Sequence, residues 1–161
     1  MAHDRVIRDA PYPRSGGSMW AGLGPATHFV LRVGAGILFM EHGLQKMFGM
    51  LGGMGGNPGA TAPIGSLIGL AGILELVGGI LLILGLAARP AALVLTIEMT
   101  VAFAKAHLPK GGWPLENGGE LALLYGLVFL FLLGNGAGPL SLDRTLGRRR
   151  TWPTDEGRRA A

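Results

Sequence analysis

Residues 65–88 form one uninterrupted apolar stretch, GSLIGLAGILELVGGILLILGLAA, with a single acidic residue near its middle. A stretch of this length is what an α-helix needs to cross a hydrocarbon core of about 30 Å. Glu75 then lies about halfway across, where a charged side chain costs about 2.5–3.5 kcal/mol on insertion scales. The chain must therefore supply a partner, a proton or a water-filled cavity for this carboxyl group.

Three other apolar segments complete the pattern. Residues 90–108 repeat it with Glu98 near the centre, and residues 25–50 and 119–135 are long enough to be further spans. The chain is 49% hydrophobic with a mean hydropathy of +0.42, and its 29 glycines fall inside the apolar runs, as in packed membrane helices. We therefore expect an all-α membrane protein, a four-transmembrane-helix bundle.

The basic residues predict how this bundle is oriented. Residues 1–22 are expected to be a flexible cytoplasmic tail, residues 23–143 the membrane domain and residues 144–161 a basic cytoplasmic tail. With four spans both tails lie on one side, and the positive-inside rule places that side in the cytoplasm. The net charge of +4 thus indicates membrane topology, not nucleic-acid binding. The bases on this side are residues 5, 8, 14, 89, 144, 148, 149, 150, 158 and 159.

Polar side chains gather in the outer half of the expected bundle. His42 and Lys46 are four residues apart and share a helix face. Glu75 and Glu98 lie at mid-depth, whereas the inner half is apolar apart from Arg32. Ionisable groups inside a membrane are candidates for function, and this asymmetry suggests a polar cavity that opens outward. The candidate binding residues are His42, Lys46, Glu75, Glu98, His107 and Glu120, of which His42, Glu75 and Glu98 are the catalytic candidates.

Each of these residues also has a purely structural interpretation. Glu75 and Glu98 can be protonated and hydrogen-bonded between helices. Arg32 and Lys105 can be anchors whose stems snorkel to the head groups. His107 can be solvated at a loop junction, and Glu120 can be an acid favoured by the N-terminus of its helix. The sequence leaves these alternatives open.

Several chemistries are excluded or weakly indicated. Cys is absent, which excludes disulfides, a thiol relay within the chain and Cys-ligated zinc or iron–sulfur clusters. His42 and His107 on different spans are only a weak indication of bis-His haem ligation. The chain contains no Glu-x-x-His of a di-iron bundle and no phosphate loop, and we predict no metal site.

Three segments together resemble the DoxX family. LRVGAGILFMEHGLQKMFG resembles its first helix, LELVGGILLILGLAARPAALVLTIEM its second and third, and ENGGELALLYGLVFLFLLGNGAGPLSLD its fourth helix and closing segment. The resemblance covers about residues 28–143. The positions that match its pattern are Arg32, His42, Lys46, Glu75, Arg89, Glu98, His107, Glu120 and Asp143.

The resemblance implies a four-helix protein of the bacterial inner membrane that is linked to redox chemistry. Related DoxD-type subunits belong to a thiosulfate:quinone oxidoreductase, and mycobacterial DoxX is associated with a thiol- and superoxide-protection complex. The leading hypothesis is a small subunit of a quinone-linked oxidoreductase, embedded in the bilayer beside other membrane subunits or in a homo-oligomer. The alternatives are a non-catalytic accessory subunit that packs against a larger complex, and an oligomeric carrier of small solutes or protons.

Overall fold

A computed structural model describes residues 23–148, and this part of the chain is helical. The expected tail at residues 1–22 and residues 149–161 of the expected basic tail lie outside the described residues. In order, the longer helices are α1 (Leu23–Phe48), α2 (Leu67–Leu84), α3 (Ala88–Ala102) and α5 (Glu120–Asn135). The shorter elements are η1 (Met54–Gly56), η2 (Phe103–His107), η3 (Leu108–Lys110), α4 (Pro114–Asn117) and α6 (Leu142–Arg148).

Three helical stretches are long and apolar enough to cross a membrane. They are Leu23–Phe48, Leu67–Leu84 and Ala88–Lys110, the last of which joins α3 to a π-helical turn and a 3₁₀ turn. Helix α5 is apolar but shorter, at 16 residues. The prediction of an all-α fold is confirmed, and the chain is a multi-pass membrane protein with three candidate spans and a shorter apolar helix.

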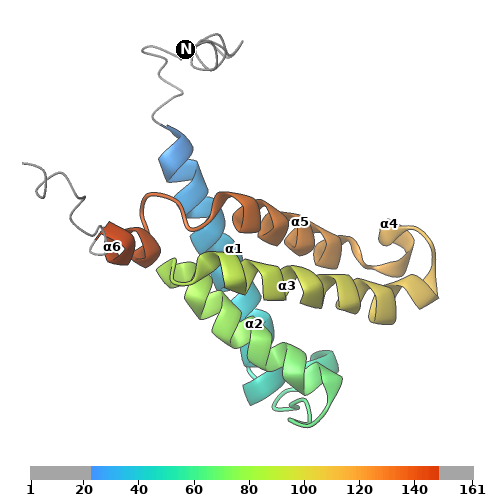
Figure 1. The fold of residues 1–161 in the computed structure, drawn as a ribbon. Helices are drawn as coiled ribbons and strands as arrows, with labels where there is room; N and C mark the ends of the chain where they lie inside the picture. Colours follow the sequence, from blue (N-terminus) through green and yellow to red (C-terminus); the bar gives the residue numbers. More distant parts are fainter. Residues whose placement is uncertain (1–22, 149–161) are drawn as a thin grey trace, which may run out of the picture.

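The long helices pack as two antiparallel hairpins. Helix α1 lies along α2, and α3 lies along α5 (Figure 1). The two hairpins are close together where α2 turns into α3 and diverge from that turn (Figure 1). Ionisable groups on α2 and α3 therefore approach one another only near the junction of the hairpins.

A glycine seam holds α1 against α2. A methyl group added at Gly43 would lie 2.5 Å from the backbone nitrogen of Leu76, and one at Gly79 would lie 2.7 Å from the carbonyl oxygen of Gly36. Gly72 meets the side chain of Lys46 in the same way. The glycines beside Glu75 therefore let α1 and α2 approach closely, and an added methyl group would not fit at these positions.

The Gly65 and Gly69 pair of the same helix does not contribute to this seam. A methyl group at Gly69 would meet Pro63 and Ile64 of the preceding loop, and Gly65 has no neighbour within 4 Å. This Gly65–Gly69 GxxxG sequence therefore packs against its own preceding loop and not against a second helix. The local reason is that the segment curls back at the start of α2, where Ser66 accepts a hydrogen bond from the Gly69 N–H.

The turn between the hairpins is fixed by backbone geometry and by one distant carboxylate. Gly85 adopts a left-handed conformation with φ of 62°, and the Leu86 N–H donates to Leu81 O at 2.9 Å, which closes a Schellman motif. Asp143, which lies far along the chain in α6, accepts hydrogen bonds from the N–H groups of Ala87 and Ala88 at 2.8 and 2.9 Å. Asp143 thereby caps α3, and α6 lies beside the turn (Figure 1).

The apolar core fills the junction of the hairpins. Phe39 of α1 packs edge-on against Phe129 of α5, with ring centroids 4.8 Å apart. Leu82, Leu95 and Leu132 are fully or almost fully buried around these rings. This core fixes the side chains of all four long helices near the polar cluster described next.

Candidate functional site

An ion pair joins the first two long helices. Lys46 Nζ of α1 donates to Glu75 Oε1 of α2, and only 3% of the Glu75 residue is exposed against 22% of the Lys46 side chain. The partner that the buried acid of residues 65–88 requires is therefore a lysine on the neighbouring helix. The glycine seam places the two residues together, since Gly72 sits against the stem of Lys46.

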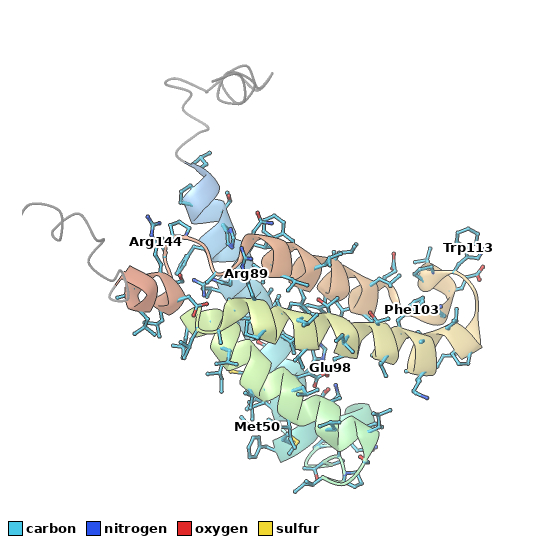
Figure 2. All side chains as sticks on the ribbon, viewed as in Figure 1. Met50, Arg89, Glu98, Phe103, Trp113 and Arg144 are labelled. Carbon is cyan, nitrogen blue, oxygen red and sulfur yellow. The ribbon has the colours of Figure 1, made fainter. Side chains whose placement is uncertain are left out.

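Other carboxyl oxygens of this site lack partners. Glu75 Oε2 and both oxygens of Glu98 are buried and accept no hydrogen bond from any residue in the described range 23–148. Glu98 is 9% exposed and lies on the side of α3 that faces the first hairpin (Figure 2). A buried carboxyl group without partners is costly, and it requires a proton, water or a ligand to complete its hydrogen bonds.

Aromatic rings form the wall beside this polar cluster. The imidazole of His42 is half-buried and stands edge-on to the ring of Tyr125, with centroids 6.0 Å apart. Tyr125 is buried and also packs on Phe39, at 5.0 Å between centroids. Tyr125 was not among the sequence-predicted site residues, because a single tyrosine in the apolar run of α5 carries no motif. Its only sequence signal is a polar atom inside a predicted span.

Arg32 requires a correction. The expectation of a snorkelling anchor is wrong, because Arg32 is fully buried between α1, α2 and the segment before α6. Its guanidinium donates to the carbonyl oxygens of Leu82 and Ile83 at the end of α2, and to Leu140 O at 2.6 Å. The last carbonyl groups of a helix have no partners within it, and a guanidinium with several N–H donors can satisfy two chain segments at once.

The remaining predicted residues lie apart from the Lys46–Glu75 pair. The His107 ring stacks near Phe103, which lies toward the far end of the second hairpin (Figure 2). His107 Nδ1 is 3.2 Å from Asn117 O. Glu120 is exposed at the start of α5. Lys105 is exposed in η2. His42 and His107 thus belong to different surroundings, and within residues 23–148 no three His, Asp or Glu side chains gather as a metal site would require.

The cluster therefore consists of one ammonium group, two carboxyl groups, an imidazole and a phenol within an apolar shell. The positive charge of Lys46 neutralises only one carboxylate, that of Glu75, and Glu98 has no cationic partner within residues 23–148. The positive charge, the orphaned carboxyl oxygens and the neighbouring ring hydroxyl are able to hydrogen-bond a polar head group attached to an apolar body. We call Lys46, Glu75, Glu98, His42 and Tyr125 the junction cluster.

These features define a class: a multi-pass helical membrane protein with an ion pair inside its fold. The chain belongs to the DoxX family, whose model matches residues 27–108, about half of its length. The earlier resemblance is thus confirmed over the first hairpin and α3, which include Lys46, Glu75 and Glu98.

The chain is also similar to proteins of two bacteria. A protein of Haemophilus influenzae, named as uncharacterized, is 42% identical over 116 residues that span 70% of this chain and 85% of its own. A Mycobacterium tuberculosis protein, named as an uncharacterized membrane protein, is 34% identical over 146 residues, or 80% of this chain and 86% of its own. No solved structure matches the chain significantly.

Proposed function

We propose that this chain is a small integral membrane subunit of a quinone-linked redox complex, and that the junction cluster holds the quinone head group. The observation that carries the proposal is the set of three buried carboxyl oxygens without partners beside Lys46. A quinone offers two carbonyl oxygens as acceptors on an apolar ring. Such a molecule suits a site with a few polar groups inside an apolar shell.

The roles of the residues follow from their chemistry. Glu98 in its neutral form donates a hydrogen bond to one carbonyl oxygen, and Lys46 polarises the head group while it stays paired with Glu75. His42 and the two acids exchange the protons that reduction of a quinone to a quinol consumes. The two electrons come from a partner subunit, since the chain has no cysteine with which to relay them.

The proposed setting is the bacterial inner membrane. There the chain crosses four times, with α5 as the shortest crossing, and both termini face the cytoplasm. The support for this orientation is the excess of Lys and Arg in the two tails and at Arg89. The partners are the lipid bilayer and other membrane subunits or further copies of the chain.

A quinone-binding measurement tests the proposal. Purified full-length protein in detergent is titrated with a short-chain ubiquinone or menaquinone, and binding is followed by quenching of tryptophan fluorescence and by extraction of bound quinone. We expect Glu98→Gln and Glu75→Gln to weaken binding about tenfold or more. Each substitution replaces a carboxyl group, which can carry a charge or give up a proton, with an amide that does neither. Glu41→Gln is the control, since Glu41 is an exposed acid on α1, the helix that carries His42 and Lys46. Binding that is unchanged in both variants would refute the assignment.

A non-catalytic accessory subunit is the second candidate. The observation that favours it is that the divergent hairpins leave large apolar side chains of α2 and α3 exposed, including Val77, Ile80 and Ile97. A larger membrane protein can pack there as well as lipid. Co-purification with a complex whose activity survives Glu75→Gln and Glu98→Gln would support this function over quinone binding. Transport by the purified protein in liposomes would instead support an oligomeric carrier.

A further inference from the structure

A cavity of about 500 Å³ lies beside the turn that follows α2, and the loop that joins α1 to α2 lies at the other end of that helix. It is bounded by the start of α3, the segment that follows α5, and α6. Arg89 and Arg144 both line it, and both lie at the end of the molecule that carries α6 (Figure 2). This cavity shares no lining residue with the junction cluster.

The two arginines give this cavity a positive charge, and their guanidinium groups are able to bind an anion. Asp143 is the single acidic residue among its lining, and its two carboxylate oxygens already accept hydrogen bonds from the Ala87 and Ala88 N–H groups. Arg89 donates one hydrogen bond, to Gly134 O at 3.2 Å. Within residues 23–148 neither arginine forms an ion pair with a carboxylate. Guanidinium groups that line a cavity without a carboxylate partner can bind the oxygens of a phosphate group.

Apolar side chains continue outward from the same arginine. A second cavity of about 490 Å³ is lined by Pro139, Leu140, Arg144 and Thr145, so Arg144 stands between the two. Leu140 of this lining is exposed, and so are Leu142 and Leu146 of the adjoining helix α6. A free phosphate ion would use the arginines and leave these leucines in water. A phospholipid uses both, with its phosphate on the cations and its acyl chains on the leucines.

We infer that Arg89 and Arg144 form a binding site for the head group of an anionic phospholipid, which docks the α6 end of the protein to one leaflet. The site is separate from the proposed quinone site and does not depend on it. Its ligand chemistry is a phosphate diester with a net negative charge. The apolar surface of α6 selects the lipid over the free ion.

Lipid titration of the purified full-length protein tests this site. The protein in neutral detergent is titrated with dioleoylphosphatidylglycerol or dioleoylphosphatidylcholine, which carry the same acyl chains, and native mass spectrometry counts the bound lipids. We expect one phosphatidylglycerol to be retained preferentially. Arg144→Gln and Arg89→Gln should each weaken its binding about fivefold, which corresponds to about 1 kcal/mol for each cation near the head groups. Lys105→Gln, which removes an exposed cation in η2, beyond the end of α3, should weaken binding less than about twofold.

Three results would overturn the inference. Equal retention of the two lipids would show that the head-group charge does not affect binding. Equal losses in Lys105→Gln and Arg144→Gln would show diffuse attraction to a basic protein. If inorganic phosphate displaced the lipid and by itself raised the thermal unfolding temperature as much, the site would be one for a free anion. Thermal unfolding of Arg89→Gln and Arg144→Gln without lipid verifies that both variants are folded.

Discussion

At the residue scale, the two cationic side chains within α1 have different tasks. Lys46 neutralises the buried acid of α2, while Arg32 satisfies carbonyl groups at the end of α2 and before α6. Both were visible in the sequence as charges within a span. Which of them would pair with a carboxylate depended on where each lies along α2. The ion pair therefore couples the fold to the proposed function, because Glu75 belongs to both.

The first prediction concerns this ion pair. Lys46→Met leaves a buried carboxylate without its ammonium, and we expect a loss of about 3 kcal/mol in the free energy of unfolding. Lys46→Met combined with Glu75→Met should recover most of that loss, because two apolar side chains can replace a buried pair. Unfolding of the purified variants in mixed micelles with increasing dodecyl sulfate measures both values. A single variant as stable as the wild type would show that the pair contributes nothing to the fold.

At the scale of elements, the first hairpin is held by glycine and the second by larger side chains. Gly36 and Gly43 of α1 meet Gly79 and Gly72–Leu76 of α2, with no room for a methyl group. In the second hairpin, Phe129 and Leu132 of α5 are fully buried. Close backbone approach in the first hairpin keeps Lys46 within reach of Glu75. The packing of α1 on α2 therefore also positions the ion pair.

The second prediction tests the glycine seam. Gly43→Ala places a methyl group against the backbone of α2, and we expect destabilisation of about 1–3 kcal/mol together with weaker quinone binding. Gly34→Ala is the matched control in the same helix, because its methyl group meets nothing within 4 Å. That control should be neutral or gain up to about 1 kcal/mol from the higher helix propensity of alanine. Unfolding in mixed micelles compares them, and equal effects of the two substitutions would contradict the seam.

At the scale of the whole molecule, two hairpins diverge from a capped turn, and the two proposed sites lie in different parts of the fold. The junction cluster lies where the hairpins meet, and the arginine cavity lies beside α6 (Figure 2). The proposed orientation places the arginine cavity at the cytoplasmic leaflet. The loop between α1 and α2 then faces the other side of the membrane.

The third prediction is this orientation, and the absence of cysteine makes it direct to measure. Asn57→Cys, in the exposed loop between α1 and α2, should react with a membrane-impermeant maleimide in spheroplasts. Thr145→Cys, in exposed α6, should react only after the membrane is permeabilised. The opposite labelling pattern would invert the proposed topology, and labelling of both in intact spheroplasts would contradict an even number of crossings.

The sequence by itself determined that the chain is helical, where its apolar segments lie and which family it belongs to. The reason is that apolar length and the positions of glycine and charge are local properties. The helix bounds accordingly agree with the predicted spans within a few residues. Glu75 and Glu98 were also singled out from the sequence, because an acidic residue inside an apolar segment can be recognised without the structure.

Only the tertiary structure decided which groups meet. The pairing of Lys46 with Glu75, the burial of Arg32 and the capping of α3 by Asp143 each join segments about 30 to more than 50 residues apart. No local pattern encodes such a contact, since it depends on the register of one helix against another. The glycine seam sets that register, because helices approach closely only where both lack side chains.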